Sequence, residues 1–168
     1  MVCSRWQPLA AAAPALHLNL YEADAYARWA AAHSGRALRL PTGAEWEHAA
    51  VNASAEPPAG APGLQDPASD WLHPQAARAE AGPQALPRLG QARGAVWQWT
   101  ASANSAYPGY RPWQGAVGEY NGKFMVDQTV LRGSSFATPR GHARLSYRNF
   151  FPAQARWQFS GLRLACEL

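Results

Sequence analysis

The first part of the chain shows the apolar spacing of an α-helix. Four apolar residues recur on one face of this segment: Ala23, Tyr26, Ala27 and Ala30. Asn19 is a good N-cap, and Glu22 three residues later can complete a capping box. Gly35 follows the apolar stripe and can take the left-handed conformation that ends many helices. The pattern therefore predicts a helix from Asn19 to Ser34.

A second, shorter helix is predicted after an extended link. Leu38 and Leu40 alternate with polar neighbours, which is typical of a short strand or an extended connection. Thr42 then opens the helix, and Glu45 stands in the capping-box position. The buried side of this helix is expected to hold Trp46, Ala49 and Ala50.

The remaining regular structure is predicted as short strands. In the segment 96–100, Trp97 and Trp99 alternate with other residues and so share one strand face. A second short strand is expected at Val130–Leu131. The segment 160–165 reads SGLRLA and predicts a third strand with two leucines on one face, Leu162 and Leu164. Two short helices, several short strands and much irregular chain indicate an α+β fold class.

Three segments show no helical or strand period. Residues 1–16 are rich in Ala and Pro and are interpreted as an irregular lead-in. The Pro- and Ala-rich segment 53–92 is either a low-complexity linker or an ordered loop pinned by Trp71 and Leu72, and the loop is preferred because a free linker rarely carries Trp. The segment 104–125 is aromatic and turn-rich, with an expected turn at the Asn-Gly pair 121–122.

Composition limits the classes of protein to consider. A chain of 168 residues with eight Trp is long enough for one domain with a real core. The net charge of +4 comes from arginine rather than from a polybasic tract, which argues against a nucleic-acid partner. No apolar run approaches membrane-spanning length, and no secretion signal is visible. The two cysteines, Cys3 and Cys166, make no disulfide framework, so a cytoplasmic protein with reduced thiols is expected.

The stretch from Leu131 to Ala165 combines positive charge with aromatic rings. No Asp or Glu occurs between Asp127 and Glu167, and the stretch contains six arginines: Arg132, Arg140, Arg144, Arg148, Arg156 and Arg163. Guanidinium groups present a rigid fork of donors to carboxylates and phosphates, so this stretch can hold an anionic ligand. On composition alone a second interpretation is equally good: the arginines lie on solvated strand faces, and the aromatic residues fill a core.

The residues do not form a complete catalytic or metal site. The five histidines include no pair at the i, i+4 spacing of a helical metal site. Glu45 and His48 form a single Glu-x-x-His, which without a second copy is more often a solvated helix face. A phosphate-binding glycine loop, a Gly-x-Ser-x-Gly elbow and a zinc-type cysteine pair do not occur. No metal site is therefore predicted, and the chain looks more like a binding surface than a catalyst.

Three sequence blocks resemble the formylglycine-generating-enzyme, or sulfatase-modifying-factor, domain. Residues 17–50 resemble its helix–LPT–helix signature, and residues 94–102 (GAVWQWTAS) resemble its G-N-V-W-E-W block. The segments YRNFFP and RWQFSGLRLA are similar to the C-terminal domain of the bacterial ergothioneine-biosynthesis sulfoxide synthases. By this resemblance residues 17–168 are a partial sulfatase-modifying-factor domain, with the Pro/Ala-rich loop at about 53–92 inside it.

The resemblance implies a fold, a reaction and a separate domain that binds the iron. The implied fold is C-type-lectin-like α+β. The implied reaction uses non-haem iron and oxygen to join a thiol substrate, cysteine or γ-glutamylcysteine, to the imidazole of hercynine (trimethylhistidine) as a sulfoxide. In such enzymes Fe(II) is held by three histidines in a separate N-terminal helical domain of the DinB type. A DinB-type domain or chain is therefore an implied partner, and no cofactor is expected on this chain itself.

The same resemblance implies roles for particular residues. Asn149 and Phe150 are expected to contact hercynine, and Arg148 or its neighbours a substrate carboxylate. The full set of implied substrate-binding residues is Arg144, Tyr147, Arg148, Asn149, Phe150 and Phe151. Some family members carry a catalytic tyrosine upstream of this segment, and Tyr110 is assigned to it, with Tyr107 as the alternative.

Departures from the family pattern keep other functions open. The chain lacks the helical iron domain and the opening part of the family domain, so it is expected to be inactive alone. Ala95 and Gln98 replace the Asn and Glu of the G-N-V-W-E-W block, and Ala95 cannot serve as a calcium ligand. A non-catalytic C-type-lectin-like binding module and an inactive remnant are the alternatives. A stand-alone formylglycine-generating oxidase ranks last, because no copper-binding cysteine pair occurs between Phe136 and Tyr147.

Overall fold

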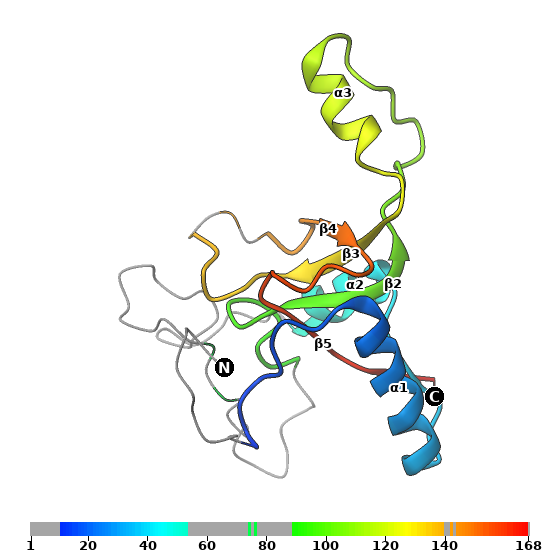
Figure 1. Ribbon diagram of the computed structural model, residues 1–168, viewed down its shortest axis with the longest axis vertical. Coiled ribbons are helices and arrows are strands. Elements are labelled where there is room, and N and C mark those ends of the chain that lie inside the picture. Colours follow the sequence, from blue (N-terminus) through cyan, green and yellow to red (C-terminus); the bar gives the residue numbers. More distant parts are fainter. Residues whose placement is uncertain are drawn as a thin grey trace.

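The computed structural model describes residues 11–53, 74, 76, 89–139, 142 and 144–167. Its helices are α1 (Leu20–Ser34), α2 (Gly43–Ala53) and α3 (Ala116–Lys123). Its strands are β1 (Leu38–Arg39), β2 (Trp97–Ala103), β3 (Gln128–Gly133), β4 (Asn149–Pro152), β5 (Ser160–Leu162) and β6 (Ala165–Cys166). Long irregular connections join these short elements, so the predicted α+β class is confirmed (Figure 1).

Helix α1 begins and ends as its local sequence predicts. The Asn19 side chain accepts a hydrogen bond from the Glu22 amide at 2.8 Å, and the Glu22 carboxylate accepts one from the Asn19 amide at 2.9 Å. Gly35 takes the left-handed conformation, with φ 67°, directly after the last helical residue. The buried face is narrower than predicted, because Tyr26 is 48% exposed and only the three alanines of the stripe are buried.

Helix α2 also begins with a capping box. The Glu45 carboxylate accepts from the Thr42 amide at 2.8 Å, and the Thr42 hydroxyl accepts from the Glu45 amide at 3.2 Å. Trp46 and Ala50 are buried as predicted, but Ala49 is exposed and that prediction was wrong. Trp46 and Ala50 stand four residues apart, so they define the inward face and Ala49 lies beside it.

A mixed four-stranded sheet forms the centre of the molecule. The strand order is β4-β3-β2-β5, in which β3 pairs antiparallel with β2 and β4, and β2 pairs parallel with β5. The short strands β1 and β6 form a separate antiparallel pair. Trp97 and Trp99 share one buried core with Leu131 and with Ala23 and Ala27 of α1, as the alternation on β2 predicts. This sheet fixes the position of β4 and of the residues that precede it.

Two predicted segments differ from the structure. The SGLRLA segment forms two short strands, β5 and β6, which residues 163–164 separate. The turn expected at Asn121-Gly122 is wrong, because these residues lie inside α3. This helix begins after Gly115, whose φ is 87°, and a Glu119–Lys123 pair at i, i+4 spacing supports it. Nothing in its sequence provides a buried apolar stripe, which is why periodicity did not reveal it.

Part of the predicted domain organisation falls outside the described residues. Residues 11–16 form a turn followed by irregular chain. Most of the segment 53–92 lies outside the described residues, including Trp71 and Leu72, so the choice between linker and loop stays a prediction. No helix in the described part of the chain is long and apolar enough to cross a membrane.

Candidate functional site

An open pocket of about 310 Å³ lies between the connection that follows β2 and the chain that leads into β4. Its lining residues are Asn104, Ala106, Tyr107, Tyr110, Met125, Arg144, Ser146, Tyr147, Arg148 and Phe150. The polar and aromatic side chains of this set therefore come from two segments that lie far apart in the sequence. The sheet brings them together, because β2 and β4 flank the same central strand, β3.

The pocket gathers five of the seven residues that the sequence predicts for the site. These are Tyr110, Arg144, Tyr147, Arg148 and Phe150. Asn149 and Phe151 do not line it, because successive side chains on β4 point to opposite faces. Phe151 instead packs on the core and against Trp157, with ring centroids 4.9 Å apart. The Asn149 side chain accepts a hydrogen bond from the Phe150 amide at 3.0 Å.

Arg148 joins the two walls of the pocket. Its guanidinium donates to the Ser105 carbonyl at 2.9 Å and lies 3.9 Å from the ring centroid of Tyr107. A cation over an aromatic face is attracted by the electron density of the ring. One face of the Tyr107 ring is therefore already occupied by a cation from the same chain.

Tyr147 anchors the pocket to the hydrophobic core. Its ring lies 5.9 Å from the Trp97 ring and 4.5 Å from the His142 ring. Arg144 is exposed nearby, and its side chain makes no hydrogen bond or ion pair with the described residues. Arg144 is thus the cation of this pocket best placed to bind an incoming anion.

A buried arginine that was grouped with the ligand contacts proves to be a support for the pocket. Arg132 is 1% exposed, and one of its nitrogens donates to the carbonyls of Ser146 and Tyr147, each at 2.9 Å. A second nitrogen pairs with the Glu47 carboxylate of α2, and the guanidinium lies 5.5 Å from the Trp46 ring centroid. Sequence reasoning missed this role, because the spacing of Glu47 and Arg132 in the chain gives no sign of their contact.

Two other arginines of the stretch, Arg156 and Arg163, do not line this pocket. Arg156 pairs with Glu22 at 2.8 Å. Arg163 donates to the Gln98 side chain at 3.1 Å and to the Gly90 carbonyl at 2.6 Å, and burial lowers the pKa of its guanidinium. Arg140 lies outside the described residues. The expectation of one arginine-rich face is therefore replaced by a pocket with two arginines, Arg144 and Arg148.

The remaining lining residues were not predicted. Asn104 is buried, and its backbone N–H donates to the Gln128 carbonyl at 2.8 Å where β2 ends. Ala106, Met125 and Ser146 lie in irregular chain, where no repeat or spacing marks a site. The signal available in the sequence was the density of Tyr and Pro around residues 107–113, which marks a loop with aromatic side chains.

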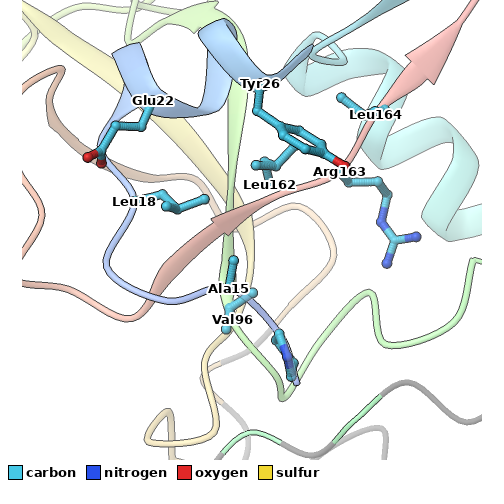
Figure 2. Close-up of a pocket in the computed structure, with 9 residues that line it drawn as sticks. Ala15, Leu18, Glu22, Tyr26, Val96, Leu162, Arg163 and Leu164 are labelled. Carbon is cyan, nitrogen blue, oxygen red and sulfur yellow. The ribbon is translucent and has the colours of Figure 1, made fainter. Parts of the chain in front are cut away.

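A second, larger pocket of about 590 Å³ has a mostly apolar lining. Figure 2 shows it between the chain that enters α1, helix α1 itself and the strand segment around Leu162. Leu18, Val96 and Leu164 contribute apolar surface, and Glu22 and Arg163 stand among the lining residues. Of the predicted site residues, none lines this pocket, so the smaller pocket is the better candidate site.

The described residues do not form a site for iron. In this part of the chain no group of three or more His, Cys, Asp or Glu side chains could hold a metal ion. The His142 ring lies tilted against the Tyr147 ring and belongs to no group of potential metal ligands among the described residues. The pocket is lined by aromatic rings, guanidinium groups and hydroxyls, and these groups suit an organic ligand.

Comparison with known proteins gives relatives over almost the whole chain. Residues 4–168 match the sulfatase-modifying factor enzyme 1-like domain. The hercynine oxygenase of Mycolicibacterium smegmatis is 34% identical over 174 residues, covering 92% of this chain and 38% of the relative. The hercynine oxygenase of Mycobacterium tuberculosis is 32% identical, covering 92% of this chain and 37% of the relative. The chain thus spans little more than a third of the length of these relatives.

Two solved structures share the fold at low sequence identity. PvdO from Pseudomonas aeruginosa aligns with a TM-score of 0.68 at 21% identity, covering 96% of this chain and 65% of that chain. Treponema denticola variable protein 1 aligns with a TM-score of 0.69 at 16% identity, covering 98% of this chain and 76% of that chain. The predicted C-type-lectin-like α+β fold is confirmed, and the chain belongs to the sulfatase-modifying factor enzyme 1-like domain family.

Proposed function

We propose that this chain is the substrate-binding domain of a sulfoxide synthase of the hercynine oxygenase type. In that role it holds hercynine and the thiol substrate while a partner supplies the iron that joins them. The observation that carries the proposal is the pocket in which Arg144, Tyr147 and Phe150 meet Tyr110. The kinship with hercynine oxygenases over 92% of the chain supports the choice of ligand.

The chemistry of hercynine fits the lining of this pocket. Hercynine carries a quaternary ammonium and a carboxylate on one carbon, beside its imidazole. Quaternary ammonium groups bind over aromatic faces, and the rings of Tyr110, Tyr147 and Phe150 are available for this contact. The Tyr107 ring is less suitable, because Arg148 already covers one of its faces. Arg144 can receive the carboxylate through two parallel hydrogen bonds.

The oxidation itself is assigned to a partner. The described residues offer no donor set for iron, so this chain positions substrates and the metal comes from a helical DinB-type domain or chain. Tyr110 remains the proposed catalytic tyrosine, because its side chain lines the pocket and is 37% exposed to an incoming reactant. We place the protein in the cytoplasm, where cysteine and γ-glutamylcysteine are kept reduced.

Calorimetry tests the proposed ligand. The chain alone should bind hercynine, bind histidine more weakly because histidine lacks the quaternary ammonium, and form no sulfoxide in the presence of iron and oxygen. Phe150→Ala should weaken the binding of hercynine. Trp157→Ala removes a side chain that is 73% exposed and outside the pocket, so it should leave the affinity unchanged. Equal affinity for hercynine and histidine would contradict the proposed role of the aromatic rings.

A non-catalytic binding module is the second candidate function. It is favoured by one observation, the lack of a metal-binding group among the residues that the structure describes. The same calorimetry separates the two functions. Binding of an unrelated sugar or peptide in this pocket, with no binding of hercynine, cysteine or γ-glutamylcysteine, would favour the module.

A further inference from the structure

The larger pocket combines an apolar wall with a single cation. Its volume of about 590 Å³ is in the range of pockets that enclose small organic ligands. Leucine and valine side chains supply most of the wall, and Arg163 is the one lysine or arginine among the described lining residues. Ligand sites are usually lined by apolar groups with a few polar groups that orient the ligand. The pocket therefore has the composition of a binding site.

The wall formed by the chain that enters α1 is fixed by hydrogen bonds to the sheet. The Leu18 amide donates to the Ser160 carbonyl at 3.1 Å. The Leu18 carbonyl accepts from the Ser160 hydroxyl at 2.6 Å and from the Trp99 indole at 2.7 Å. Ala15 packs closely on β5, because a Cβ added at Gly161 would lie 2.8 Å from the Ala15 carbonyl oxygen. The pocket is therefore a preformed feature of the fold.

Arg163 carries donor groups that the described chain does not use. Its guanidinium donates to the Gln98 side chain and to the Gly90 carbonyl, and both acceptors are neutral. A guanidinium has five N–H groups, so three of them have no acceptor among the described residues. Gln98 takes the place of the Glu in the family's sequence block, so the carboxylate of that block is replaced by a neutral amide. Arg163 is thus a partly buried cation without a counter-charge in the described chain.

The two charged residues of the pocket stand at opposite sides of it (Figure 2). The Glu22 carboxylate is already neutralised, because it accepts from the Asn19 amide at 2.9 Å and pairs with Arg156 at 2.8 Å. The Tyr26 side chain points toward the Arg163 side, and its hydroxyl makes no hydrogen bond with the described residues. A phenolic hydroxyl and a guanidinium can both donate to a carboxylate. An anionic group is therefore favoured at the Arg163 side and disfavoured at the Glu22 side.

We infer that this pocket binds a medium-chain carboxylic acid. Its carboxylate lies on Arg163, and its hydrocarbon chain lies along Leu18, Val96 and Leu162. A neutral apolar molecule would cover the guanidinium without pairing it, and a small polar anion would leave the apolar wall in water. The inference is independent of the proposed function, because the two pockets share no lining residue.

Calorimetry with octanoate tests the class of ligand, and two matched probes separate its parts. Octan-1-ol has the hydrocarbon chain without the charge, and acetate has the charge without the chain. Each should bind at least about tenfold more weakly than octanoate, because the first loses hydrogen bonds between charged groups and the second loses the burial of its chain.

Three variants locate the carboxylate. Arg163→Met keeps an apolar side chain without a charge and should weaken the binding of octanoate at least about tenfold, which equals about 1.4 kcal/mol. Gln98→Glu leaves the Arg163 side chain in place but gives it an internal counter-charge, and it should cause a loss of similar size. The matched control is Arg36→Met, which removes an exposed arginine just beyond α1 and should bind octanoate as the wild type does.

The inference is overturned by equal affinity for octanoate and octan-1-ol, by an equal loss in Arg36→Met and Arg163→Met, or by a wild type that binds no octanoate. A loss in Arg144→Met that is absent in Arg163→Met would place the carboxylate in the smaller pocket and would overturn it as well. Thermal unfolding without ligand identifies a variant that does not fold, and if Arg163→Met is that variant, Gln98→Glu decides the test. A wild type that binds octanoate but not hercynine supports this inference and contradicts the proposed function alone.

Discussion

The ion pair between the buried Arg132 and the partly exposed Glu47 gives the strongest test of how the pocket wall is held. Glu47→Gln keeps the shape of the side chain but leaves the Arg132 guanidinium without its counter-charge. Removing one partner of a buried ion pair costs about 3–5 kcal/mol in unfolding free energy. The Glu47 side chain is 37% exposed, so water can approach the gap, and we expect a loss near the lower end, about 3 kcal/mol.

A double-mutant cycle isolates the contribution of the pair. Arg132→Met leaves no buried charge at that position, so adding Glu47→Gln to it should cost less than about 0.5 kcal/mol. Urea unfolding of the wild type, both single variants and the double variant should thus show a coupling of about 2.5 kcal/mol. The exposed pair of Asp24 and Arg28, treated in the same way, should show less than about 0.5 kcal/mol. Additive effects of Glu47→Gln and Arg132→Met would refute the reasoning.

Three further predictions address the ligand contacts, a helix end and an exposed carboxylate. Phe150→Ala should weaken the binding of hercynine by about 2- to 30-fold, because one aromatic face contributes about 0.5–2 kcal/mol to the binding of a cation. Calorimetry measures the affinity of this variant, and Trp157→Ala is the control. Gly35→Ala should lower the unfolding free energy by about 1 kcal/mol, because φ is 67° there and a side chain is strained; Ala37→Gly, in the exposed chain just beyond the helix, is the control for thermal unfolding. Hydrogen bonds from Arg39 and from the Thr42 amide lower the pKa of Glu45 from 4.5 to about 2. The stability that Glu45 contributes is therefore complete above pH 4.5 and is lost as the pH falls towards 2, so the difference between wild type and Glu45→Gln in urea unfolding should shrink over that range; a constant difference would contradict the assignment.

The elements that could be predicted from the sequence are those held by short-range contacts. The caps of α1 and α2 depend on residues three apart, Asn19 with Glu22 and Thr42 with Glu45, and both capping boxes are present. The alternation around Trp97 also predicted correctly which strand face lies in the core, because successive side chains of a strand point to opposite faces. The exposed Tyr26 and Ala49 show the limit of this approach, since an apolar residue beside a buried stripe need not be covered.

The parts that could not be predicted depend on contacts between distant segments. Arg132 and Glu47 are 85 residues apart, and neither local sequence shows that the core encloses Arg132. Arg132 was therefore grouped with arginines that could hold a ligand, although its guanidinium is occupied by the protein. The pocket residues Asn104 and Met125 were missed for the same reason. Family resemblance, rather than periodicity, pointed to Tyr147, Arg148 and Phe150.

The two walls of the pocket are held in different ways, and this difference bears on the function. One wall is fixed, because the carbonyls of Ser146 and Tyr147 bind the buried Arg132 and the Tyr147 ring packs on Trp97. The other wall belongs to the connection between β2 and β3, whose helix α3 lacks extensive contacts with the described helices and strands. A fixed wall can bind and orient a substrate before any partner arrives. Arg148 nevertheless ties this wall to the fixed one, because its guanidinium donates to the Ser105 carbonyl and lies over the Tyr107 ring, so we expect the pocket to be formed in this chain alone.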